Sequence, residues 1–324
     1  MQIIAHKKIF FCNYWLTYRC NSKCEICNFW KDKNLQEIQD ASFTDAKKNL
    51  DDLKKMGIKF IDFTCGEPLL NEDLSQILAF AKKLGFFVKL STNGLLYPEK
   101  AKELYGLPNR IYLSLDTTSK DEYKKIRGID GFDKVIESIR IAKKYNQDIC
   151  LLYTVTDENI KNLSEMVCFA KKNKITLYIH PCFSYFNNKQ LNPKNINDIK
   201  KYFWHPYVRM SLPQLDFHKN GGNNTLKPRC QVGFSTVDIG PDNSLTIPCN
   251  HRTIKRYKIE NNLFSIFNSK TWNELFCNAG KYEFCNHCTI DCYFGMSYLD
   301  RLDKYFIKQN LTFLKNLIES ARIK

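Results

Sequence analysis

The sequence predicts an α/β fold in which six successive βα units are followed by a small, cysteine-rich α+β unit. Between residues 9 and 181, short β-rich runs alternate with amphipathic helical segments, which is the pattern of a parallel sheet. After residue 229, cysteines and turn residues replace this alternation. The length of 324 residues exceeds the usual size of a single core and favours one large domain with a smaller appendage.

Six β-rich runs are the predicted strands of the large domain. Between them, apolar residues recur at helical spacing, as in Leu74, Ile77, Leu78 and Ala81. Both an open six-unit barrel and a doubly wound sheet fit this order, and in either fold ligands bind beyond the C-terminal ends of the strands. The predicted strands are residues 10–17, 59–64, 86–90, 111–115, 149–155 and 175–179.

The pattern divides the chain into four parts. We expect the barrel-like domain over residues 1–183, a linker with one short helix near 196–203 over 184–228, the cysteine-rich unit over 229–295 and a helix over 296–324. Asp242 and Asn243 predict a hairpin turn between strands at 236–239 and 244–247. The terminal helix is basic and amphipathic, and these apolar residues are expected to pack on the rest of the protein: Leu299, Leu302, Phe306, Ile307, Leu311, Leu314 and Ile318.

The composition narrows the class of protein. Apolar residues make up 44% of the chain and charged residues 26%, which excludes general disorder. The net charge is +15, but the lysines are spread in doublets over many predicted helices, so we expect no nucleic-acid partner. No stretch is long and apolar enough to span a membrane, and residues 1–8 lack a signal-peptide core. We therefore expect a cytoplasmic protein in which the clustered members of its fourteen cysteines serve metal or redox chemistry.

Cys20, Cys24 and Cys27 form a Cys-x3-Cys-x2-Cys run directly after the first predicted strand. Three thiolates at this spacing suit one face of a cubane iron–sulfur cluster. Structural zinc and iron–sulfur sites usually have four protein ligands, so three without an obvious fourth predict an open coordination position. A substrate or cosubstrate would bind at that position.

This run resembles the radical S-adenosylmethionine (radical SAM) enzymes, in which Cys-x3-Cys-x2-Cys holds a 4Fe-4S cluster on a partial (β/α)6 TIM-like barrel. Cys65 stands where that family usually has the first glycine of a Gly-Gly-Glu-Pro motif. Further motifs follow in the family's order at predicted strand ends or in a loop before a helix: Thr64-Cys65-Gly66-Glu67-Pro68, Ser91-Thr92-Asn93-Gly94, Ser114-Leu115-Asp116 and Lys125-Ile126-Arg127-Gly128.

The resemblance implies a binding site for S-adenosylmethionine, whose amine and carboxylate would chelate the open iron. Arginine is the preferred side chain for binding a carboxylate through two hydrogen bonds, and hydroxyl or carboxylate groups suit ribose oxygens. Ile26 occupies a position that is often aromatic in the family, so the adenine contact would be aliphatic or would come from Phe29. The implied neighbours are Gly66, Glu67 and Pro68 for the amine, Arg127 and Asn93 for the carboxylate, and Ser114 or Asp116 for the ribose.

Five more cysteines lie in the C-terminal unit, and four soft thiolates there suit either an iron–sulfur cluster or structural zinc. The arrangement resembles the auxiliary modules of radical SAM enzymes called twitch or SPASM. A full SPASM module uses seven cysteines for two clusters, so we expect one auxiliary 4Fe-4S cluster. The preferred ligands are Cys230, Cys249, Cys285 and Cys288, with Cys292 as the substitute.

His180 and Cys182 follow the sixth predicted strand, where side chains face a bound substrate. Either could transfer a proton or a hydrogen atom, and a structural role is the simpler interpretation for each. Cys65 follows the second predicted strand in the same way, so its side chain could also face the substrate.

The resemblance also implies a reaction. An electron from a flavodoxin or ferredoxin would drive cleavage of S-adenosylmethionine to a 5′-deoxyadenosyl radical, which would functionalise or oxidise an unactivated C–H bond. A small alcohol, sugar or other metabolite fits a single auxiliary cluster, and a ribosomal peptide fits the module's commonest association. A lipid or isoprenoid fits the basic terminal helix and the ending at 285–294, which resembles adenosylhopane synthases.

A non-catalytic alternative is a zinc-stabilised binding scaffold. It explains the second group of cysteines and the positive charge. It leaves unexplained the open-sided first triplet and the three strand-end motifs.

Overall fold

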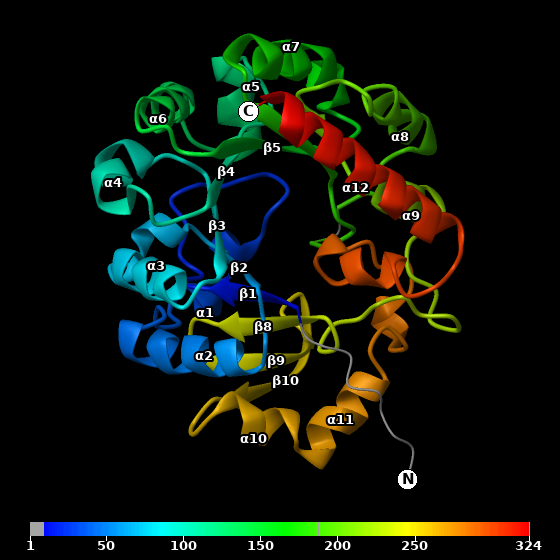
Figure 1. The fold of residues 1–324 in the computed structure, drawn as a ribbon. Helices are drawn as coiled ribbons and strands as arrows, with labels where there is room; N and C mark the ends of the chain where they lie inside the picture. Colours follow the sequence, from blue (N-terminus) through cyan, green and yellow to red (C-terminus); the bar gives the residue numbers. More distant parts are fainter. Residues whose placement is uncertain (1–9, 187, 324) are drawn as a thin grey trace.

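The computed structural model describes residues 10–186 and 188–323. Its strands form one sheet in the order β10-β9-β8-β1-β2-β3-β4-β5-β6-β7, which curls into an open barrel within this part of the chain (Figure 1). Strands β1 to β7 run parallel, and β8 pairs with β1 in parallel before β9 and β10 continue antiparallel. The predicted partial barrel is therefore confirmed.

The six predicted barrel strands all form, with bounds that differ from the prediction by two residues at most. β-branched and aromatic residues fill them, because such side chains pack well on a pleated surface. The observed strands are β1 (Phe11–Trp15), β2 (Phe60–Thr64), β3 (Phe87–Thr92), β4 (Arg110–Ser114), β5 (Ile149–Val155) and β6 (Thr176–Pro181).

Helices cover the outer face of these strands (Figure 1). Each presents one apolar stripe to the sheet, as in α3, where the predicted residues Leu74, Ile77, Leu78 and Ala81 are fully buried. The covering helices are α2 (Phe43–Lys55), α3 (Leu74–Lys83), α4 (Tyr97–Leu104), α5 (Lys120–Arg127), α6 (Phe132–Lys144) and α7 (Leu163–Asn173).

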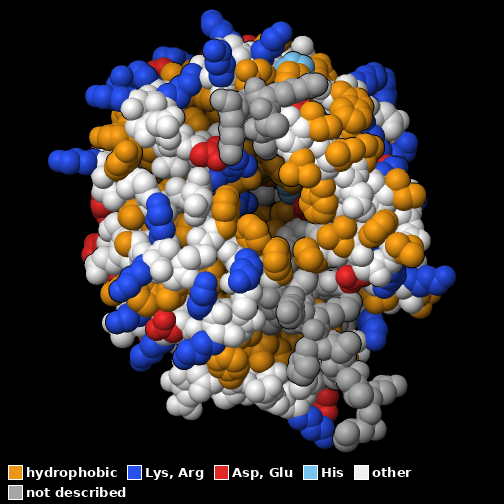
Figure 2. Space-filling model, viewed as in Figure 1, with side chains coloured by type: hydrophobic (Ala, Val, Ile, Leu, Met, Phe, Trp, Pro, Cys, Tyr) orange, Lys and Arg blue, Asp and Glu red, His pale blue; other side chains and the backbone are white. Residues whose placement is uncertain are grey.

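The inner face of the barrel is open to solvent. On β4, Ile111 and Leu113 are fully buried under the helices, whereas Tyr112 and Ser114, between and beyond them, are partly exposed. The same alternation holds on β3 and β6. Because successive side chains of a strand point to opposite faces, the partly exposed set lines the interior. Figure 2 shows the molecule hollowed at its centre.

The segment 184–228 is more ordered than the predicted linker with one short helix. It contains α8 (Pro193–Lys200), the two-residue strand β7 (Val208–Arg209) and α9 (Leu212–Lys219). β7 extends the barrel sheet beside β6, and every residue of α9 except its last is buried. The segment thus forms part of the wall of the molecule.

The predicted hairpin is confirmed as β8 (Thr236–Gly240) and β9 (Ser244–Cys249), followed by β10 (Arg252–Lys258), α10 (Leu263–Phe267) and α11 (Lys270–Cys277). These strands continue the barrel sheet. The side-chain amide of Asn13 on β1 donates to Asp238 Oδ1 on β8 at 2.8 Å. The cysteine-rich unit is therefore joined to the barrel by direct strand pairing.

The terminal helix α12 (Lys304–Ile323) packs on α9, but its apolar face is not the buried one. The predicted helix begins at Lys304 rather than at residue 296. The expected packing is wrong for four of the listed residues, while Lys315 and Glu319 are buried; the exposed residues are Leu302, Ile307, Leu314 and Ile318, at 90%, 69%, 54% and 42%. Lys315 pairs with Glu319 at 3.3 Å, and Glu319 also pairs with Arg209. This ion-pair network is the physical reason that the charged face turns inward. Among the described residues, no helix is long and apolar enough to cross a membrane.

Candidate active site and second cysteine site

The Cys-x3-Cys-x2-Cys loop follows β1 at the C-terminal end of the barrel. Its three thiols are partly exposed, and none forms a disulfide. Burial raises the pKa of Cys20 to about 12 and that of Cys27 to about 11, and the neighbouring thiols of the loop add to both shifts. Thiolates in this loop therefore need a cationic partner, which is what a metal cluster supplies.

Two predicted cofactor residues lie against these thiols. The side-chain amide of Asn93, after β3, is 3.9 Å from Cys20 Sγ. Arg127, at the end of α5, places Nη1 3.8 Å from Cys24 Sγ. The motif at the end of β3 and the motif 125–128 thus meet at the thiol loop, and residues 125–127 form the last turn of α5 rather than the predicted loop.

Glu67 ties the ends of β2 and β3 together. Its buried carboxylate accepts from Thr92 Oγ1 at 2.6 Å, the Asn93 backbone at 2.7 Å and the Leu69 backbone at 3.0 Å. Burial raises its pKa to about 7, and these three donors oppose that shift. Gly66 precedes it at φ 55°, and Pro68 begins a 3-10 turn over Pro68–Leu70.

Arg127 and Asp116 form a buried ion pair at 2.5 Å, and the Thr154 backbone donates to the other Asp116 oxygen at 2.9 Å. Burial raises the pKa of Asp116, and Arg127 opposes this. Arg127 Nε and the buried Tyr123 hydroxyl have no hydrogen-bond partner. Two unpartnered donors beside a buried cation fit a ligand carboxylate, so these residues suit S-adenosylmethionine. Ser114, at the end of β4, is partly buried nearby in sequence.

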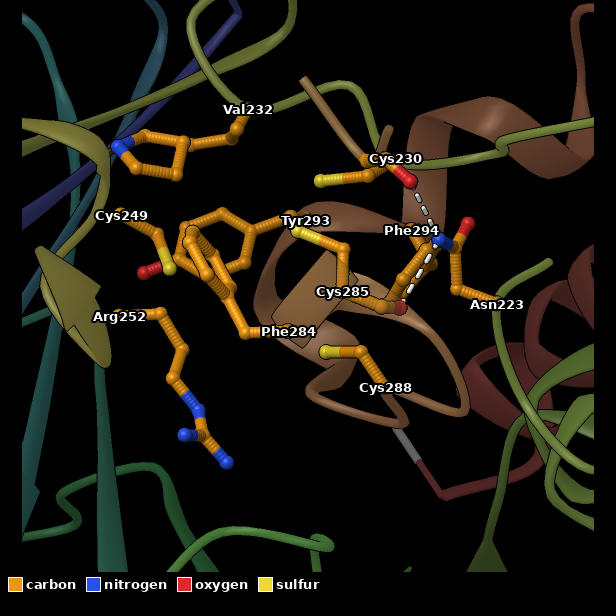
Figure 3. Close-up of a pocket in the computed structure, with 12 residues that line it drawn as sticks. Asn223, Cys230, Val232, Cys249, Arg252, Phe284, Cys285, Cys288, Tyr293 and Phe294 are labelled. Carbon is orange, nitrogen blue, oxygen red and sulfur yellow. Dashed lines mark hydrogen bonds between the residues drawn. The ribbon is translucent and has the colours of Figure 1, made fainter. Parts of the chain in front are cut away.

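Four of the five C-terminal cysteines line a single cavity. It contains about 350 Å³ of space free of protein atoms, part of it open to solvent, and it holds Cys230, Cys249, Cys285 and Cys288 (Figure 3). Figure 3 shows their sulfurs turned toward this shared space. Asn223 holds the loop by donating to the carbonyls of Gly280 and Cys285 at 2.8 and 3.0 Å. The predicted preferred set therefore converges in space.

Arg252 lies near two of the four thiols that line this cavity. Among the described residues, no three Cys, His, Asp or Glu side chains come together closely enough for a single ion. Burial raises the pKa of Cys285 and of Cys288, whereas Arg252 on β10 lowers both. Arg252 is therefore placed to favour the thiolates that a cluster binds.

Cys292 lies elsewhere. It does not line the cavity, and it is near Lys89 and Asp62, on the inner face of the barrel strands. Its side chain is exposed, yet the surrounding protein raises the pKa of its thiol by burial. Both observations agree if Cys292 faces the hollow interior. The substitute ligand is thus separated from the other four.

The two candidate catalytic residues differ in their surroundings. His180 is partly exposed to the interior, its Nε2 is 3.0 Å from Gln214 Nε2, and burial lowers its pKa to about 3. Its imidazole is therefore neutral. Cys182 is buried beyond the strand end, and burial raises the pKa of its thiol to about 12.

The sequence analysis missed an interior charge pair. Lys89 on β3 bonds to Asp62 on β2 at 2.7 Å and lies 4.2 Å from the centre of the Tyr112 ring. Asp291, in the C-terminal segment, has its pKa raised to about 7 by burial, an effect that Lys89 opposes. The sequence did contain a signal for this pair, because Asp62 and Lys89 each lie inside a predicted strand. Charged residues in buried strands usually have a partner of opposite charge.

Comparison with known proteins agrees with this geometry. Residues 15–169 match the family model described as the Radical SAM superfamily. The GTP 3′,8-cyclase of Clostridium acetobutylicum is 36% identical over 152 residues, which are 46% of this chain and 48% of that protein. The chain spans about half the length of the curated relatives it matches.

Two solved structures share the fold over most of the chain. SuiB of Streptococcus suis bound to S-adenosylmethionine gives a TM-score of 0.68 at 14% identity and covers 92% of this chain and 75% of that one. Native anSMEcpe with bound AdoMet gives 0.65 at 17% identity and covers 97% and 98%. The thiol loop, Glu67, Asn93 and Arg127 all lie within the segment that the family model matches, and residues 15–169 are a radical SAM domain.

Proposed function

We propose that this protein is a radical SAM enzyme that functionalises or oxidises an unactivated C–H bond of a polar small molecule. Cys20, Cys24 and Cys27 would hold a 4Fe-4S cluster, and Arg127 would bind the carboxylate of S-adenosylmethionine. The observation that carries the proposal is the buried Arg127, whose guanidinium contacts a thiol of the loop and keeps Nε unpartnered. When bound, the cluster and S-adenosylmethionine supply a 5′-deoxyadenosyl radical.

The protein's own residues hold the cosubstrate and shield the reaction. Asp116 fixes the Arg127 fork through their ion pair, so that the free donors face a ligand. Glu67 braces the two strand ends through its three hydrogen bonds. The barrel wall positions one C–H bond of the substrate, because a primary radical reacts with whatever lies nearest.

The second cysteine site supports an auxiliary 4Fe-4S cluster held by Cys230, Cys249, Cys285 and Cys288. The partners that we propose are a flavodoxin or ferredoxin as electron donor and a polar substrate, with a cytoplasmic location where thiols stay reduced. The polar barrel interior, with Asp62, Lys89 and His180, favours this substrate over a lipid or isoprenoid.

Peptide modification is the second candidate, and one observation favours it. Strand β10 stands at the end of the sheet, and its first four residues are exposed. A free sheet edge is where extended peptides add as a further strand.

Anaerobic reconstitution tests the proposed function. The wild-type protein is expected to bind roughly eight iron atoms, as two cubane clusters require, and to release 5′-deoxyadenosine from S-adenosylmethionine with dithionite. Cys20→Ala is expected to abolish this release and to reduce the iron to roughly four per chain.

Cys168→Ala is the matched control, because Cys168 is an exposed thiol on α7 outside both sites. It is expected to behave like the wild type. Undiminished release of 5′-deoxyadenosine by Cys20→Ala would overturn the proposal. One or two zinc atoms per chain without any cleavage would support the binding scaffold instead.

A further inference from the structure

One wall of the barrel interior carries polar atoms without partners. Gln214 Oε1, both ring nitrogens of His218, Asp291 Oδ1 and the Tyr298 hydroxyl are buried and make no hydrogen bond of good geometry. The backbone of Thr289 lies close enough to the His218 ring to oppose the lowering of its pKa by burial. Buried polar atoms are nearly always paired in proteins, so a group of them on one wall calls for a ligand or ordered water.

These residues belong to two elements that meet next to β6. Gln214 and His218 lie on α9, one turn apart, and Asp291 and Tyr298 lie in the segment 289–298. The side-chain amide of Gln214 is 3.0 Å from His180 Nε2 on β6. Asp291 raises the pKa of both Tyr298 and Tyr178, which places its carboxylate between the C-terminal segment and β6.

The front of this wall is accessible from the hollow. Tyr178, His180 and Asp291 are partly exposed, whereas Gln214, His218 and Tyr298 are at least 97% buried behind them. A ligand in the hollow therefore contacts the polar groups of the partly exposed residues. Behind them, the buried residues have unused hydrogen-bonding capacity.

The free groups of the wall include acceptors and donors, since a neutral histidine ring carries one N–H and the Tyr298 hydroxyl can donate. Asp291 offers a carboxylate oxygen and Gln214 a carbonyl oxygen, while burial keeps His180 and His218 neutral by lowering their pKa values to about 3 and about 4. Two cations near the wall are already held: Lys89 by Asp62 at 2.7 Å and by the Tyr112 ring, and Arg229, near Tyr298, by Asp303. The wall thus has unused acceptors and donors and no free positive charge of its own.

We propose that this wall binds the substrate and that the substrate is a compact molecule rich in hydrogen-bond donors, a polyol or amino-polyol. The inference rests on the proposed function and names the substrate class of that same interior. Unused acceptors and donors within one small area need several groups that both donate and accept on one small molecule, which the hydroxyl groups of a sugar-like ring provide. A triphosphate is disfavoured at this wall, because the wall would face it with a carboxylate and no unpaired lysine or arginine.

Ligand-observed saturation-transfer NMR on the reconstituted holoenzyme tests this. The probes are glucosamine, myo-inositol and GTP. At least one of the first two is expected to bind with a Kd below about 10 mM and more tightly than GTP. Binding of glucosamine alone would show that the wall recognises an amine of the ligand. Equal binding of both probes would show that it recognises hydroxyl groups.

At pH 8.5, above the Asp291 pKa of about 7, the side chain is ionised, and Asp291→Asn keeps its shape and removes its charge. It is expected to weaken binding of the preferred probe at least about tenfold, since hydrogen bonds to charged groups contribute about 1.5–3 kcal/mol. Asp121→Asn, an exposed acid on α5, removes the same charge outside the interior and is expected to bind like the wild type.

Release of 5′-deoxyadenosine without substrate separates the two proposals. If the wild type releases none, the proposed function fails. If release is normal in the wild type and in Asp291→Asn, the fold and the first site are intact. The inference is then overturned by equal probe binding to the two proteins, by tighter binding of GTP, or by no binding of either polyol to the wild type.

Discussion

Two glycines hold the thiol loop from opposite sides. Gly66 follows β2, and an added Cβ would lie 2.3 Å from the Arg19 carbonyl; Gly128 follows α5, and an added Cβ would lie 2.3 Å from the Lys23 carbonyl. Both have positive φ, which side-chain-bearing residues rarely adopt. Backbone hydrogen bonds accompany each contact: the Glu67 amide donates to Arg19 and the Lys23 amide to Arg127. These residues therefore set the position of the loop before any ligand binds.

Gly128→Ala is expected to disturb this loop specifically. The new methyl group must displace the Lys23 backbone, so iron at the first site is expected to be lost, with roughly four atoms per chain left at the second site. Gly106→Ala is the matched control, since Gly106 also has positive φ but has nothing within 4 Å of an added Cβ. It is expected to lower the free energy of unfolding by about 1–2 kcal/mol and to keep its iron. Iron analysis and urea unfolding measure both effects, and equal iron loss in the two variants would contradict this role.

Among the secondary-structure elements, α12 shows where pattern and structure diverge. Hydrophobic periodicity places Ile307 and Leu314 on the buried face, yet both are exposed, because the Lys315, Glu319 and Arg209 network occupies the interface. Periodicity assumes that apolar surface is buried first, and it carries no information on a partner charge 110 residues earlier in the chain. The two-residue strand β7 escapes prediction for a related reason, since only its pairing with β6 defines it.

Glu319→Leu is expected to destabilise the protein by about 3–5 kcal/mol, because it leaves Lys315 and Arg209 buried without their anion. The triple variant Arg209→Met, Lys315→Met and Glu319→Leu is expected to recover most of this loss, since apolar replacements leave no buried charge unpaired. Urea unfolding gives the free energies. A single variant that loses less than about 1 kcal/mol would show that the network is solvated and does not determine the orientation of α12.

In the molecule as a whole, the continuous sheet brings the two cysteine sites into one structure. The sequence predicted the barrel strands and the hairpin, because alternating and β-branched residues mark them locally. It did not predict that β8 pairs with β1, since the partners Asn13 and Asp238 are 225 residues apart and their bond has no local signature. The site residues divide in the same way: the first triplet is contiguous and recognisable, whereas the separate location of Cys292 depends on the tertiary fold.

This continuity predicts that the barrel and the cysteine-rich unit unfold together. Beyond the pairing of β1 with β8, the Leu263 amide of α10 donates to Asp52 of α2 at 2.9 Å, so the unit is attached at two places. Trp272 on α11 is buried against Phe267 and Phe276, so its fluorescence reports on the folding of the cysteine-rich unit. To make it the single tryptophan of the chain, the tryptophans at positions 15, 30 and 204 are replaced by phenylalanine. Its fluorescence and the far-UV circular dichroism are expected to change at the same urea concentration. Asp52→Ala is expected to lower both midpoints equally, whereas an earlier transition of Trp272 would show that the unit is independently folded.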